Sequence, residues 1–349
     1  MGIAGENLAG SHSATEFVAW YNGHPDYADR TYDLSGERAV IVGNGNVALD
    51  IARILVTDPD ELARTDMADH AVAALRTSAI REVVVVGRRG PAQAAFTTPE
   101  LLALGHLQGV DLIVEDEGAL NLAVQNALVD ADTDPHIRWK VDLLEEYANR
   151  PKAADRKRIV LRFLAVPIEL TGTGRVEGVT LERTELHEAD GRWEATGTGH
   201  TETLETGFVL RSVGYRGTPV ADMPLDERGT IPNNAGRVID AETGDPVLGA
   251  YTAGWIKRGP SGVIGTNRHC SAETVENLVE DFVAGRLSEP TCSLEKLDVL
   301  VAERVPHFVD YKGWQQIDRN ERAAGNEAGK SRRKFVTRPD LVRASIPEA

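Results

Sequence analysis

Two short apolar runs in the N-terminal half of the chain each end at a glycine. Residues 39–42 read Ala-Val-Ile-Val, and residues 83–86 are four valines. Continuous apolar runs of this length are typical of strands buried on both faces of a parallel sheet. Between them, residues 51–55 repeat apolar positions at helical spacing. The order of strand, helix and strand predicts a βαβ unit and therefore an α/β fold.

The turn after the first run has the pattern Gly-x-Gly-x-x-Ala that is typical of dinucleotide-binding units. Gly43 allows a tight turn, and Gly45 lets backbone N–H groups come close to a pyrophosphate. Ala48 is small enough for the helix and the strand to pack closely. The pyrophosphate would lie at the positive end of the helix, where unpaired N–H groups point towards it. We therefore predict a dinucleotide site at this turn.

The residues after the second run indicate which dinucleotide binds. NAD-binding units usually carry an acidic residue there, which accepts hydrogen bonds from the ribose hydroxyls. Here Gly87 is followed by Arg88 and Arg89, whose forked donors suit the 2′-phosphate of NADP. The alternative is that the two arginines form a solvated turn. The separation between Gly43 and Arg88 is about twice the usual one, so residues 57–81 predict a lengthened helical connection.

Another helix start is predicted at residues 97–100, which read Thr-Thr-Pro-Glu and place a hydroxyl and a proline at the first helical positions. Two interpretations of Glu100 stay open. Its carboxylate faces the adenosine ribose, or the helix dipole favours a negative charge in the first turn.

The remaining periodic segments extend this order of elements. An alternating pair, residues 178–183 and 203–206, predicts antiparallel strands inserted into the domain. Residues 222–240 are rich in turn residues and predict a connection between domains. The other predicted helices are residues 14–21, 120–128 and 136–147, and the other predicted strands are residues 111–117, 159–163, 208–215 and 248–254.

A second glycine-rich turn follows the last predicted strand. Glycines at positions 259, 262 and 265 permit close backbone approach to a flat ligand, and residues 272–282 are amphipathic at helical period. A glycine-rich turn that meets a helix N-terminus predicts a second phosphate- or flavin-facing site. The alternative is a plain glycine-rich loop.

The charge and the cysteine content of the chain exclude several classes of binding partner and cofactor. The net charge of -16 argues against nucleic acid or an anionic membrane as the main partner. The two cysteines lie far apart without a Cys-x-x-Cys motif, which argues against an iron–sulfur cluster or a cysteine-rich zinc site. No membrane span or signal peptide is predicted, so we expect a cytoplasmic location. The basic stretch 156–158 is either a docking site for an acidic partner or a solvated surface.

Several motifs, in a consistent order, resemble the adrenodoxin-reductase-type NADPH–ferredoxin reductases. They are the glycine turn at residues 43–50, the Val-Gly-Arg-Arg-Gly-Pro sequence at 86–91, the glycine-rich segment at 254–264, and the segments 17–25 and 314–318. The likeness extends over nearly the whole chain. It implies a flavoprotein fold with two dinucleotide-binding domains, one for NADP and one for FAD.

The resemblance also implies particular site residues. Trp255 would lie against the flavin and the nicotinamide, and Gly262, Val263 and Ile264 would present backbone N–H groups to the isoalloxazine of FAD. The residues implied for NADP are Gly43, Gly45, Asn46 and Val47 at the pyrophosphate, Arg88 and Arg89 at the 2′-phosphate, and Glu100 at the adenosine.

The chemistry implied by the resemblance is hydride transfer from NADPH to FAD, followed by single-electron transfer to a ferredoxin-type iron–sulfur protein. No catalytic acid–base residue or metal ligand is assigned. The expected docking region for the ferredoxin is basic and comprises Arg138, Lys140, Arg156, Lys157 and Arg158.

One departure from the family pattern concerns the start of the chain. Members of the family begin with an FAD-binding glycine-rich unit, which this sequence does not contain at its start. We therefore expect residues 1–34 to be a connecting remnant of the FAD domain, residues 35–214 to be a complete NADP-binding Rossmann-like domain, and residues 215–349 to be the C-terminal part of the FAD-binding domain. The chain alone is expected to bind NADP but to hold FAD poorly.

The sequence leaves two alternatives to a complete ferredoxin reductase. One is an NADP-binding subunit or fragment without turnover, which would show nucleotide affinity but no electron transfer. The other is an oxidoreductase like the small subunit of glutamate synthase, which is disfavoured because the chain lacks the cysteine-rich region of that group.

Overall fold

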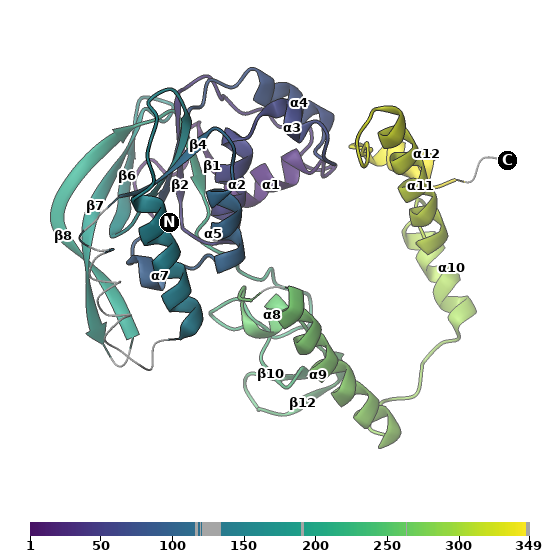
Figure 1. Ribbon diagram of the computed structural model, residues 1–349. Helices are drawn as coiled ribbons and strands as arrows, with labels where there is room; N and C mark the ends of the chain where they lie inside the picture. The colour runs from purple at the N-terminus through teal and green to yellow at the C-terminus, as the bar shows by residue number, and fades with distance from the viewer. Residues whose placement is uncertain (116–117, 119, 121–133, 190–191, 263, 347–349) are drawn as a thin grey trace. The chain divides into compact units, whose positions relative to one another are not determined.

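The computed structural model describes residues 1–115, 118, 120, 134–189, 192–262 and 264–346. The chain divides into two compact units (Figure 1). The first unit is Met1–Val213 together with Val309–Ala349, and the second is Gly214–Phe308.

A parallel sheet forms the centre of the first unit, which confirms the predicted α/β class. All of its pairings are parallel, and β2 and β3 are hydrogen-bonded neighbours, as expected of a βαβ unit. In spatial order its strands are β1 (Ser11–Ser13), β9 (Phe208–Arg211), β2 (Arg38–Val42), β3 (Glu82–Val86), β5 (Lys157–Arg162) and β4 (Val110–Glu115).

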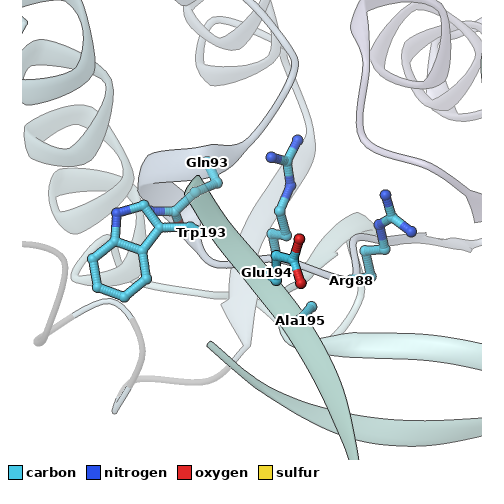
Figure 2. Close-up of a pocket in the computed structure, with 6 residues that line it drawn as sticks. Arg88, Gln93, Trp193, Glu194 and Ala195 are labelled. Carbon is cyan, nitrogen blue, oxygen red and sulfur yellow. The ribbon is translucent and has the colours of Figure 1, made fainter. Parts of the chain in front are cut away.

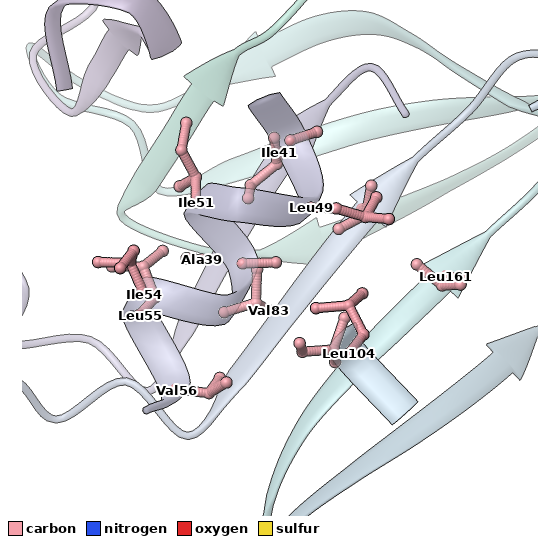
Figure 3. Packing of buried hydrophobic residues seen from close by; sticks show 14 of the residues in the cluster. Ala39, Ile41, Leu49, Ile51, Ile54, Leu55, Val56, Val83, Leu104 and Leu161 are labelled. Atoms are coloured by element: carbon pink, nitrogen blue, oxygen red, sulfur yellow. The ribbon is translucent and has the colours of Figure 1, made fainter. Parts of the chain in front are cut away.

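Side chains alternate between the two faces of this sheet, and both faces are buried. Ile41 and Leu161 belong to the cluster on the helical face, together with residues of α2 such as Leu49 (Figure 3). Val84 and Val160 belong to a second cluster on the opposite face. Burial on both faces explains why these strands are continuous apolar runs rather than alternating ones.

Helices cover one face of the parallel sheet, and a second sheet covers the other (Figure 1). The second sheet is antiparallel, in the order β6, β7, β8, which confirms the predicted antiparallel pair. Strand β6 was not predicted, because Pro167 interrupts its pattern; the pairing shifts register there. These elements are α1 (Ala14–Tyr21), α2 (Asn46–Val56), α5 (Thr98–Gly105), α7 (Pro135–Ala148), β6 (Ala165–Thr171), β7 (Gly178–Ala189) and β8 (Arg192–Glu205).

Two short helices, α3 (Pro59–Leu62) and α4 (Asp69–Arg76), lie between α2 and β3. They confirm the predicted lengthened helical connection. The predicted helix at residues 120–128 lies almost entirely outside the described residues.

The N- and C-terminal segments both belong to the first unit, which differs from the expected division of the chain. Strand β1 pairs with β9, and Phe17 of α1 is fully buried. The C-terminal segment carries α11 (Tyr311–Glu327) and α12 (Arg338–Ala344). Its Lys330 ammonium donates to the Met67 carbonyl at 3.1 Å and pairs with Asp69 at 2.6 Å. Such contacts join residues that are distant in sequence, so local patterns do not report them.

The second unit pairs a small antiparallel sheet with a long helix. Residues 222–240, predicted as a connection, contain two of its strands. Arg237 of β11 also forms an ion pair with Asp281 of α9 at 2.8 Å. Helix α9 also begins earlier than the predicted residue 272. The elements of this unit are β10 (Asn233–Asn234), β11 (Arg237–Ile239), β12 (Pro246–Tyr251), α8 (Trp255–Arg258), α9 (Ile264–Val283) and α10 (Leu294–Arg304).

None of the helices in the described ranges is long and apolar enough to cross a membrane.

An ion triad joins three strands at the amino-terminal edge of the parallel sheet. Glu82 lies between Arg38 and Arg158 in register, and both guanidiniums donate to its carboxylate. Burial raises the pKa of the Glu82 carboxyl, but the hydrogen bonds and charges of the two arginines outweigh burial and hold the pKa below its usual value.

We expect Glu82→Gln to lower the free energy of unfolding by about 1–3 kcal/mol at pH 7, because charge-assisted hydrogen bonds are lost. The folded pKa is depressed, so the stabilisation is present above the unfolded pKa of about 4.3 and is lost as the pH falls through the folded pKa. Urea unfolding at pH 7 and at pH 3 measures both effects. Glu37→Gln, an exposed carboxylate near the same edge, is the control. If Glu82→Gln lowered the free energy of unfolding by the same amount at pH 7 and at pH 3, the result would contradict this account.

We expect Gly43→Ala to destabilise the protein by about 2 kcal/mol or more. Gly43 has a φ of 110°, and a Cβ there would lie 2.1 Å from the carbonyl oxygen of Ser212. Gly45→Ala is the matched control, because its φ is -87° and a Cβ would meet open space. We expect a smaller loss of about 0.5–1 kcal/mol, because alanine is a poorer N-cap residue than glycine. Urea unfolding compares the two. Equal tolerance at both positions would show that Ser212 imposes no constraint.

Candidate functional site

The predicted glycine turn lies at the carboxyl edge of the parallel sheet. The chain leaves β2 towards β3 on one side, and β9 returns on the other side. This reversal of direction is the topological switch point at which ligands bind in open α/β sheets. The ends of the strands are tied together there, since Gly43 N donates to Val86 O at 2.8 Å and Ser212 N donates to Val42 O at 2.7 Å.

Helix α2 begins at this edge with an N-terminus suited to an anion. Gly45 is its N-cap residue and supplies no side-chain acceptor. The Ala48 and Leu49 amides donate to the Gly45 carbonyl. Within the described residues, the amides of Asn46 and Val47 have no hydrogen-bond partner. Unpaired amides at a helix N-terminus attract a phosphate or carboxylate.

Two asparagine side chains connect the glycine turn to the following loop. The Asn46 carboxamide accepts a hydrogen bond from Thr97 N at 2.8 Å, and that of Asn44 accepts one from Ala95 N at 3.5 Å. Asn44 also lies over Gly87, where a Cβ would be 2.3 Å from its Nδ2 atom. The sequence predicted Asn46 as a site residue but missed Asn44. The only indirect indication of Asn44 in the sequence was Gly87, because Asn44 occupies the space that a side chain at position 87 would need.

Arg88 and Arg89 lie in the loop after β3, and the antiparallel sheet holds the backbone of this loop. The Thr184 hydroxyl, on the buried side of β7, donates to the Arg88 carbonyl at 2.7 Å. Leu164 N donates to the Arg89 carbonyl at 3.3 Å. In the part of the chain that the structure describes, neither guanidinium makes a hydrogen bond or an ion pair. Both are available to an anionic ligand.

The side chains of Arg88 and Arg89 line a pocket of about 490 Å³ (Figure 2). One wall is the loop after β3 with the short helix η1 (Pro91–Gln93), and the other is the start of β8. The volume falls within the roughly 300–1,000 Å³ of small-molecule sites. The lining residues are Arg88, Arg89, Gln93, Trp193, Glu194 and Ala195.

Lys140 of α7 is buried beside this loop and is not a surface residue. Its ammonium donates to the Ala94 carbonyl at 2.7 Å and lies 5.7 Å from the centre of the Phe96 ring. Burial lowers the pKa of Lys140, and the positive charge of Arg89 lowers it further. The expectation that Lys140 docks an acidic partner is therefore wrong, because its charge is enclosed by the protein.

The basic stretch that includes residues 156–158 is partly neutralised. Arg156 forms an ion pair with the buried Asp111 at 3.4 Å, and Arg158 donates to Glu82. Lys157 and Arg158 lie within β5 rather than before it. Burial lowers the pKa of Lys157.

Glu100 lies in the first turn of α5, and its side chain is half-buried. The described residues offer its carboxylate no hydrogen-bond partner. This position fits a charge favoured by the helix dipole. Contact with a ribose stays a prediction.

The second unit contains the other predicted glycine turn. Trp255 starts α8 with 40 % of its surface exposed, and its ring lies 5.3 Å from that of Tyr215. Gly262 has a φ of 84° and leads into α9, which begins at Ile264. The predicted meeting of a glycine turn and a helix N-terminus is therefore present, whereas Val263 lies outside the described residues.

No protein-family model matches the chain. The chain is 46% identical over 347 residues to the "Probable ferredoxin/ferredoxin--NADP reductase" of Mycobacterium tuberculosis, which covers 98% of this chain and 57% of that protein. It therefore spans little more than half of that relative. It is 45% identical to the "NADPH-ferredoxin reductase FprA" of Mycobacterium leprae, over 98% of this chain and 74% of that protein.

A solved structure shares the fold. It is described as "Mycobacterium tuberculosis FprA in complex with NADPH" and superposes with a TM-score of 0.90 at 44% identity, covering 99% of this chain and 75% of that chain. The chain is more than 30% identical to the reductase from Mycobacterium leprae and covers more than two thirds of that protein. This relationship agrees with the parallel sheet, the glycine turn and the arginine loop. The chain belongs to the family of NADPH–ferredoxin reductases.

Proposed function

We propose that the protein is an NADPH–ferredoxin oxidoreductase and that it binds NADP at the carboxyl edge of β2 and β3. The observation that carries this proposal is the pair of guanidiniums of Arg88 and Arg89. Both lack a partner among the described residues and both line a pocket next to the glycine turn. A 2′-phosphate would supply the anion for them, and forked donors match its oxygens.

In this assignment each group of the glycine turn has a defined task. The free amides of Asn46 and Val47 would donate to the pyrophosphate, and the open space above Gly45 would admit it. Gly43 would act through the backbone, because its positive φ sets the direction in which the chain enters α2. Glu100 would face the adenosine side.

The FAD site is proposed at the glycine turn of the second unit. Trp255 is partly exposed at the start of α8, and among the described residues no atom lies within 4 Å of a Cβ placed at Gly259 or Gly265. This open backbone suits a flat ring system, and Gly262, Val263 and Ile264 are the residues proposed to donate to the isoalloxazine. The flavin supplies hydride acceptance from NADPH and release of single electrons. The protein would contribute orientation and stacking.

The proposed electron acceptor is a ferredoxin-type iron–sulfur protein, as the names of the relatives indicate for those proteins. Docking near Arg138, Arg156, Lys157 and Arg158 stays a proposal. We expect Arg156 and Arg158 to add little attraction for an acidic partner, because Asp111 and Glu82 already compensate their charges.

We expect Arg88→Ala to weaken NADP binding by about 10- to 100-fold, because one charge-assisted hydrogen-bonding group at the 2′-phosphate is removed. NAD lacks this phosphate, so its affinity should change less than about threefold. Isothermal titration calorimetry with NADP⁺ and NAD⁺ measures both. Arg76→Ala is the matched control, since Arg76 pairs with Asp60 outside the pocket. Equal losses for the two nucleotides would contradict recognition of the 2′-phosphate.

We expect anaerobic NADPH to bleach the flavin absorbance when FAD is kept in the solution with the protein, and to leave it unchanged in a control that contains FAD but no protein. Visible absorption spectra before and after NADPH test the oxidoreductase proposal. A flavin band that NADPH leaves unchanged, with NADP⁺ binding still present by calorimetry, would contradict electron transfer. That result would favour an NADP-binding protein without turnover.

A further inference from the structure

We propose that Trp193, at the start of β8, is the stacking surface for the adenine ring of the 2′-phosphorylated nucleotide. The β7–β8 hairpin is then a specificity element of the pocket rather than only a cover for the parallel sheet. The inference rests on the proposed NADP site, and it assigns a role to a residue on a different element from the glycine turn and the arginine loop.

The hairpin is bonded to the arginine loop close to the pocket. Thr184 is opposite Gly197, which is two residues after the pocket residue Ala195. Thr184 of β7 donates to the Arg88 carbonyl. Leu186 lies against the same loop, because a Cβ at Gly90 would be 3.2 Å from its Cδ1 atom. The face of the hairpin that carries residues 184 and 186 is therefore turned towards Arg88 and Arg89.

Strand register places Trp193 on this face. Leu186 is opposite Ala195, and Glu188 is opposite Trp193. Side chains two residues apart on a strand share a face, so Trp193 and Ala195 lie on the side of Leu186. Both line the pocket, and in the view of Figure 2 the indole of Trp193 lies on the same side as Gln93.

The indole has the properties of an unoccupied stacking surface. Trp193 is 45 % exposed, and no aromatic ring in the described ranges packs against it. A flat apolar surface and two unpaired guanidiniums in one pocket fit a ligand that joins an aromatic base to an anion. Adenosine 2′-phosphate combines these two groups. Any nucleobase can stack on a tryptophan ring, because every base presents a flat π-face.

The experiment uses 2′,5′-ADP, which carries the adenine and the 2′-phosphate but no nicotinamide. We expect Trp193→Ala to weaken its binding by about 10-fold in calorimetry, within the range measured for loss of base stacking. Trp193→Phe should keep the affinity within about threefold. Trp139→Ala is the matched control, because Trp139 is similarly exposed on α7 but does not line the pocket. Pyrophosphate, which has no base, should bind Trp193→Ala and wild type equally.

A second readout separates stacking from support of the fold. Binding of 2′,5′-ADP should quench tryptophan fluorescence in wild type, and this change should be absent in Trp193→Phe. Unchanged affinity of Trp193→Ala, with Arg88→Ala still weakened, would overturn the inference and leave the NADP site standing. Loss of pyrophosphate binding in Trp193→Ala would also overturn it, because the tryptophan would then act on the fold. Failure of wild type to bind 2′,5′-ADP would instead overturn the proposed function.

Discussion

The common register of β9, β2 and β3 determines where the site can form. Val42 is level with Val86 on one side and with Arg211 on the other. The three strands therefore end together, and the chain must turn at three neighbouring places within a small volume. Gly43 is under the tightest constraint, because the carbonyl of Ser212 occupies the position that a side chain would take. The direction of α2, and with it the free amides at its start, depends on this contact.

The antiparallel sheet has two structural consequences that follow from one packing arrangement. Its residues Val179 and Leu181 bury Val84 and Val160 on the face of the parallel sheet that the helices do not cover. The same arrangement brings Thr184 to the carbonyl of Arg88 and places the start of β8 over the arginine loop. The packing of the core and the position of the pocket wall are thus coupled through one strand.

Arginines at the two edges of the parallel sheet have different environments. At the amino-terminal edge, Arg38 and Arg158 converge on the buried carboxylate of Glu82 and contribute to stability. At the carboxyl edge, Arg88 and Arg89 have no such carboxylate partner within the described part of the chain. Free cations in a chain of net charge -16 concentrate a local attraction for anions at the edge where the helix dipole acts in the same direction.

Local sequence determined much of the fold, together with the glycine turn and the arginine pair of the candidate site. The parallel strands, α2 and the antiparallel pair follow from periodicity, because burial on one or two faces selects which residues are apolar. The glycine turn and the arginine pair were also readable, since their chemistry depends on residues that are adjacent in the chain. The grouping of the C-terminal segment with the first unit was not readable, because its contact through Lys330 and Asp69 joins residues that are distant in sequence.

Only the tertiary structure decided which residues from distant segments line the pocket. Trp193 lies more than one hundred residues after Arg88 in the chain, and the register of β7 with β8 brings it to the pocket. Lys140 is basic in the sequence but enclosed in the structure, where it bonds to Ala94. Sequence specifies which groups can bind or pair, whereas long-range packing decides which of them face a ligand, because burial and register are properties of contacts between distant segments.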